Sequence, residues 1–72
     1  MKIEDLRSLL KATPFVPFWV VLPNGEKLRI PHPEFAWIHP GERAVWVALE
    51  SGGTRLINWP LVTGLEVPEP TA

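Results

Sequence analysis

The two histidines and the carboxylates near them are the residues whose types could bind a metal ion. Glu34 lies between His32 and His39, and Glu42 follows three positions after His39. Imidazole and carboxylate groups are common zinc ligands, so a carboxylate–histidine site is one interpretation of this cluster. However, the spacing matches no metal-binding motif, and each histidine precedes a proline in a loop-like segment. We therefore predict solvated loop histidines, with no metal site and no cofactor.

The two serines are poorly placed for nucleophilic catalysis. Ser8 falls in a predicted helix, and Ser51 falls in a Gly-rich segment, where serine is ordinary turn chemistry. That segment, Glu50-Ser51-Gly52-Gly53, also lacks the lysine and the following helix of a phosphate-binding loop. We therefore predict that the protein is not an enzyme.

Aromatic side chains are unusually frequent in this chain. It has four tryptophans and three phenylalanines among 72 residues. One small core cannot enclose all of them, so some aromatic surface must lie at an interface, in a groove or on a half-buried rim. Trp37 and Trp59 could line a groove for a proline-rich peptide, with core or rim packing as the alternative interpretation.

Size, charge and cysteine content restrict the class of protein. A chain of 72 residues forms one domain and buries only about 60% of its unfolded surface. The absence of cysteine excludes disulfides and thiolate metal sites, so association is the remaining common way to bury more area. A net charge of −1 excludes a generic basic nucleic-acid coat, which depends on neutralising phosphates.

The N-terminal segment predicts a cytoplasmic protein. Glu4 and Asp5 stand where a signal peptide would have an apolar run. No apolar stretch approaches the ~20 residues of a membrane span, so we expect no membrane partner.

Hydrophobic periodicity predicts one helix followed by short strands, in a single domain over residues 1–67. Apolar residues at near-helical spacing indicate a helix over about residues 2–11, and Pro14 ends it. Its apolar face must dock on the domain, and one open end of a barrel is the expected target. Strands are expected over about residues 18–22, 26–30, 44–49, 54–58 and 63–67, with a flexible tail at 68–72. Residues 34–38 are expected to be a bent continuation of the second strand.

Turn chemistry predicts how these strands are joined. Pro23-Asn24-Gly25 fits a three-residue hairpin turn in which the glycine adopts the left-handed conformation. Residues 59–62 fit a single 3₁₀ turn, and Gly64 would mark a bulge or a close backbone approach. The strands at 18–22 and 44–49 are apolar on both faces, so a helix, a loop or another copy of the chain must cover their second faces.

This order of elements resembles the Sm-like barrel of the bacterial Sm-like RNA chaperone and its archaeal and eukaryotic relatives. The resemblance is carried by Val20–Leu28, with its strand, Asn-Gly turn and strand, by Glu34-Phe35 and by Ile57–Val67. It implies a mainly β fold, a small five-stranded Sm-like or SH3-like barrel with a short N-terminal α-helix. Pro14–Phe18 and His32–Phe35 are also similar to segments of a group of short uncharacterised bacterial proteins, a likeness that implies no particular activity.

The resemblance to the Sm-like family also implies RNA-binding residues. In that family, RNA occupies pockets formed by the loop between the second and third strands and by the turn between the fourth and fifth. Those positions here include Phe35 and Trp37 in the loop and Asn58 and Trp59 in the turn. An aromatic ring and an amide together suit a nucleic-acid base, because the ring stacks on the base and the amide forms hydrogen bonds to the edge of the base. This chain has Asn58-Trp59 where the family carries an Arg-Gly or a Lys-His pair.

Two functions are compatible with these features. The first is a non-enzymatic structural or interaction module that works as a homo-oligomer, with Trp19, Val21 and Trp46 as the self-association residues. The second is an Sm-like protein that binds single-stranded RNA. The expected partner is therefore the chain itself, with single-stranded RNA or another protein as the alternatives.

Overall fold

The computed structural model describes residues 1–68 and places one helix before six short strands. The helix is α1 (Ile3–Lys11), followed by β1 (Phe18–Val21) and β2 (Lys27–Ile30). A 3₁₀ helix, η1 (Pro33–Phe35), then precedes β3 (Ala36–Ile38) and β4 (Ala44–Ala48). The last elements are β5 (Thr54–Asn58), the 3₁₀ helix η2 (Trp59–Leu61) and β6 (Gly64–Glu66). Apart from Pro68, the predicted tail lies outside the described residues.

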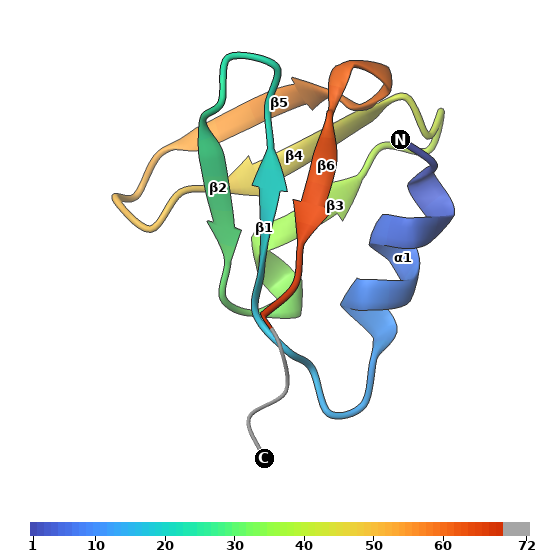
Figure 1. Cartoon of the computed structure of the whole chain (residues 1–72), viewed down its shortest axis with the longest axis vertical. Helices are drawn as coiled ribbons and strands as arrows, with labels where there is room; N and C mark the ends of the chain where they lie inside the picture. Colours follow the sequence, from blue (N-terminus) through green and yellow to red (C-terminus); the bar gives the residue numbers. More distant parts are fainter. Residues whose placement is uncertain (69–72) are drawn as a thin grey trace.

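The strands form two antiparallel sheets of three strands, in the orders β2–β1–β6 and β3–β4–β5. The first sheet lies in front of the second in Figure 1, and their strands cross at a steep angle. The predicted mainly β fold with one N-terminal helix is confirmed. The structure shows two packed sheets, and the pairing that would close them into a barrel is not detected among the described strands.

The predicted hairpin turn between β1 and β2 is confirmed in detail. The Gly25 amide donates to the Leu22 carbonyl over 2.9 Å, and the Leu22 amide donates to the Glu26 carbonyl over 2.8 Å. Gly25 has a φ of 88°, which is the left-handed conformation that favours glycine. The turn between β4 and β5 repeats this pattern at Leu49–Gly53 with Gly52 at a φ of 108°.

Residues 34–38 do not continue β2, which corrects the predicted five-strand count. The chain leaves the first sheet after Ile30, forms η1 at Pro33–Phe35 and then pairs β3 with β4. Pro31 and Pro33 explain the break, because proline cannot donate a ladder hydrogen bond and restricts the residue before it.

Gly64 is not a site of close backbone approach, since nothing lies within 4 Å of the Cβ that a substitution would add there.

One apolar core lies between the two sheets and α1. Alternate residues of the strands point into it, which is the period-two pattern of a strand with one buried face. From α1, Ile3 and Leu6 join the core, and Leu6 is fully buried. α1 lies beside β6 (Figure 1), with Leu9 and Leu65 lining the groove between them. The core residues are Ile3, Leu6, Phe18, Val20, Leu22, Leu28, Ile30, Ala36, Val45, Val47, Ile57, Trp59 and Val62.

Within residues 1–68, no helix has the length and apolar character needed to cross a bilayer.

Candidate association surface

The outer face of the β3–β4–β5 sheet gathers exposed apolar side chains. Val45 and Val47 of β4 are fully buried in the core, so Trp46 between them points away from it. Leu56 points outward in the same way beside the buried Ile57 of β5. Trp37 lies outward on β3, next to the buried Ala36.

These three outward side chains are direct cross-strand neighbours. The register pairs Trp37 with Trp46 and Trp46 with Leu56. Directly opposed residues have Cβ atoms about 4.5–5.5 Å apart, close enough for their side chains to pack. Trp37 is 49% exposed, Trp46 43% and Leu56 57%. We call Trp37, Trp46 and Leu56 the tryptophan row.

No charged side chain interrupts this face within the three strands. The residues beside the row are Ala44, paired with Asn58, and Ala48, paired with Thr54. Exposed apolar surface without charges is typical of sites that contact another macromolecule. An uncharged face also meets a copy of itself without like-charge repulsion.

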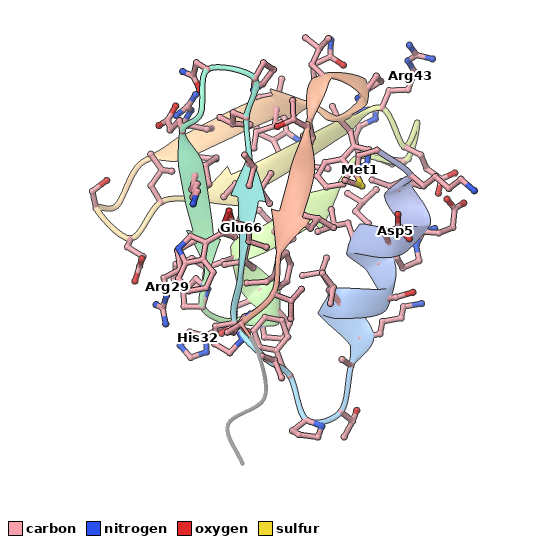
Figure 2. All side chains as sticks on the ribbon, in the orientation of Figure 1. Met1, Asp5, Arg29, His32, Arg43 and Glu66 are labelled. Carbon is pink, nitrogen blue, oxygen red and sulfur yellow. The ribbon has the colours of Figure 1, made fainter. Side chains whose placement is uncertain are left out.

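The outer face of the other sheet is different, because ion pairs cover it. Arg29 lies 6.0 Å from the centre of the Trp19 ring, and its guanidinium contacts Glu50 over 3.1 Å. Lys27 contacts Glu66 over 2.9 Å across β1. Figure 2 shows Arg29 and Glu66 on this side of the molecule. The half-buried Trp19 is therefore surrounded by charges that already have partners.

The three predicted self-association residues consequently lie on two surfaces. Trp19 and Val21 belong to the outer face of β2–β1–β6, whereas Trp46 belongs to the outer face of β3–β4–β5. Both sheets direct their opposite faces into one shared core, so these two surfaces point in different directions. Of the two, only the surface with Trp46 is uncharged.

The four predicted RNA-binding residues are also dispersed. Phe35 is partly buried against the core beside His32, with ring centres 5.8 Å apart. Trp37 and Asn58 share the outer face of β3–β4–β5. Asn58 is two strands away from Trp37 and offset by two residues along the strand, which places the two residues about 12 Å apart. Trp59 is only 2% exposed. A base could not stack on the Trp59 ring without opening the core.

The Trp59 indole carries an unusual feature for a core residue. Its Nε1–H is buried and has no hydrogen-bond partner among residues 1–68. Buried polar groups are normally paired, and an unpaired donor costs about 1–3 kcal/mol. Trp59 therefore has a packing role that comes with an energetic cost, and it cannot line an exposed groove with Trp37.

Three cations on the strands, Lys27, Arg29 and Arg55, are paired with carboxylates. Besides Lys27 and Arg29, Arg55 of β5 donates to Glu26 over 2.5 Å. This hydrogen bond, with the positive charge of Arg55, lowers the pKa of the Glu26 carboxyl below its ordinary value. Phosphate binding depends on cations that can be redirected to the ligand, so these pairs do not favour it.

The histidines and serines are not gathered into a reactive cluster. Nδ1 of His39 accepts a hydrogen bond of 3.0 Å from the Gly41 amide, which is a local turn contact. Ser8 is exposed on α1, and Ser51 is exposed in the turn before β5. Across residues 1–68, no three His, Cys, Asp or Glu side chains are close enough to hold a metal ion together.

Leu56, which extends the apolar row to the edge of the sheet, was not predicted from the sequence. The available signal was alternation in Thr54–Asn58, because placing Ile57 inward forces Leu56 outward. Residues 36–38 were also not predicted to form a strand of the second sheet, and this strand places Trp37 beside Trp46.

Comparisons with protein-family models, curated proteins and solved structures found no match for this chain, so no family is identified. Its fold and surfaces are therefore the basis for inferring a function.

Proposed function

We propose that this domain is a non-enzymatic interaction module that associates with a second copy of itself through the outer face of the β3–β4–β5 sheet. The observation that carries the proposal is the tryptophan row, an exposed line of two tryptophans and a leucine on a face without charges. Two such faces would stack as the sheets of a β-sandwich do, about 10 Å apart.

The exposed area of the row fits a substantial part of such an interface. A tryptophan side chain buries at most about 250 Å², so the exposed parts of Trp37 and Trp46 amount to about 230 Å² per copy. A standard interface buries about 800 Å² per partner. Leu56, the flanking alanines and the polar rim would contribute the remainder.

We also propose a finer description of the fold, an opened Sm-like or SH3-like barrel. The sheet orders β2–β1–β6 and β3–β4–β5 would follow from such a barrel if its second strand were broken between Ile30 and Ala36. The one-turn η2 before the last strand also fits this order. A shared fold would not transfer RNA binding to this chain, because function depends on the site.

The test is the solution mass of Trp46→Glu beside a matched control, Trp19→Glu. Each change puts a carboxylate on the outer face of a central strand, in different sheets. Covering the exposed part of Trp46 stabilises an interface by up to about 2.7 kcal/mol per copy. We therefore expect Trp46→Glu to raise the dissociation constant at least 100-fold in sedimentation equilibrium. Trp19→Glu should keep the parent mass.

Four outcomes would contradict the proposal. A parent protein that is monomeric at every concentration has no self-association to explain. A mass unchanged in Trp46→Glu places the contact elsewhere, and a mass lost in Trp19→Glu moves it to the charged face. Excess absorbance at 260 nm on the protein peak, together with binding of short U-rich or A-rich oligonucleotides, would identify single-stranded RNA as the partner instead.

A further inference from the structure

The two sheets have four edges, and three of them are protected against pairing with another chain. β2 carries the exposed cations Lys27 and Arg29. β3 is only three residues long and lies between Pro33 and Pro40. β6 is also three residues long, and α1 lies alongside it (Figure 1). Charges, prolines, short length and a covering helix are the usual ways of blocking an edge.

The edge of β5 has the fewest of these protections, since it carries one charged residue and has no proline and no covering helix. It is five residues long and contains no lysine or proline, and among the described strands it pairs only with β4. β5 carries one charge, Arg55, against two on β2, and all three contact a carboxylate. The edge borders an open cavity of about 290 Å³, lined by Leu22 and Asn24 of the hairpin and by Leu61 after β5. The unpaired backbone groups of β5 can therefore reach a partner strand.

We propose that β5 pairs in antiparallel fashion with β5 of a second copy, about a twofold axis that passes through Leu56. This edge contact goes beyond the face contact proposed above and uses different atoms, the free backbone groups of β5. Leu56 of one copy would lie opposite Leu56 of the other. Arg55 would lie opposite Ile57, and Thr54 opposite Asn58.

The residues of β5 favour this register over its neighbours. Sliding the copies so that Arg55 meets Arg55 places two like charges directly opposite, which is destabilising. Sliding the other way, with Ile57 opposite Ile57, leaves only three of the five residues of β5 paired. The register centred on Leu56 pairs all five and puts no like charges opposite each other.

The pairing also extends the tryptophan row. The twofold axis stands perpendicular to the sheet, so both outer faces stay on the same side of a six-stranded sheet. Leu56 of each copy becomes the neighbour of Leu56 of the other, and the two rows join. The face contact has its twofold axis parallel to the sheet, and if the two perpendicular axes intersect, they close an assembly at about four chains.

Cysteine cross-linking tests this register directly, because the chain has no cysteine of its own. Opposed residues of an antiparallel pair have Cα atoms about 4.5–5.5 Å apart, within the about 4.4–6.8 Å of a disulfide. We expect Leu56→Cys to form a disulfide-linked dimer under mild oxidation, seen on a non-reducing gel. The matched control is Thr54→Cys, an exposed residue of the same strand and face. Its copies would lie about 14 Å apart, so it should remain unlinked.

A mixture of Thr54→Cys and Asn58→Cys should form the heterodimer, because the register places these residues opposite each other. The proposal is overturned if Leu56→Cys links no faster than Thr54→Cys, or if the mixture gives no heterodimer while circular dichroism shows both variants folded.

The same experiment in a Trp46→Glu background separates this proposal from the proposed function. Stacked faces hold Cα atoms about 10 Å apart, too far for a disulfide, so the face contact does not produce the Leu56 cross-link. A persisting cross-link with a mass that Trp46→Glu leaves unchanged supports the edge contact and refutes the face contact. If the cross-link is lost and Trp46→Glu lowers the solution mass, the face contact is supported and the edge contact is refuted.

Discussion

Replacing Trp59 tests whether this residue belongs to the core or to a binding site. The indole is 2% exposed, and truncating a buried tryptophan to alanine costs about 3–5 kcal/mol. A domain of 72 residues has a total stability of about 4–11 kcal/mol, so Trp59→Ala should lose a large share of it. Trp46→Ala is the matched control, because the same side chain is 43% exposed there. On the buried area alone, it should cost about 60% as much.

Trp59→Phe refines this test. Phenylalanine keeps a ring in the core and removes the Nε1–H that has no partner. Removing an unpaired buried donor recovers about 1–3 kcal/mol, which offsets the cavity left by the smaller ring. We therefore expect Trp59→Phe to stay within about 1 kcal/mol of the parent.

Urea unfolding followed by far-UV circular dichroism measures all three variants without depending on tryptophan emission. It should be repeated at several protein concentrations, because association raises apparent stability. If Trp59→Ala unfolds at the parent midpoint, Trp59 is not a core residue. If Trp59→Phe is as damaged as Trp59→Ala, the Nε1–H has a partner, and the reasoning about an unpaired donor is wrong.

Two smaller changes test a turn and an ion pair. Gly25→Ala should cost about 1 kcal/mol in the same urea assay, because φ is 88° there, whereas Gly64→Ala, with open space around its Cβ, should match the parent. Equal effects at both glycines would show that the left-handed turn is not the cause. The hydrogen bond from Arg55 lowers the pKa of Glu26 in the folded protein below the ordinary 4.5, so its contribution to stability is present above that value and lost as the pH falls through the lowered pKa. Glu26→Gln should therefore melt below the parent near pH 7 and together with it near pH 2, and a difference that persists in acid would contradict this assignment.

The sequence predicted the local structure well wherever residue chemistry restricts the backbone. Apolar spacing predicted α1 to within about one residue, and Pro23-Asn24-Gly25 predicted the turn geometry between β1 and β2. The break between β2 and β3 was harder to predict from the sequence. Pro31 and Pro33 indicate an interruption, but they do not say which strand the following apolar residues will join. That choice depends on long-range pairing with β4, which no local signal encodes.

The surface could be predicted only in part, for a related reason. Alternation along β4 indicated that Trp46 leaves the core, but the same alternation along β1 indicated it for Trp19. What distinguishes the two positions is their cross-strand neighbours. Trp19 has Arg29 and Glu66 as partners, whereas Trp46 has Trp37 and Leu56. Register is a property of paired strands. The sequence of one strand therefore cannot show which tryptophan has uncharged cross-strand neighbours.

The composition of the tryptophan row is not required by the folding of one copy. Outer positions of the other sheet carry Lys27, Arg29 and Glu66, so charged side chains are compatible with strand positions of this kind in the same chain. A polar β-former such as threonine would also satisfy the strand preference at Trp46. The row leaves about 230 Å² of indole surface that residues 1–68 of one copy do not cover. In the proposed association, the free energy available from covering that surface would be realised through contact with a second copy.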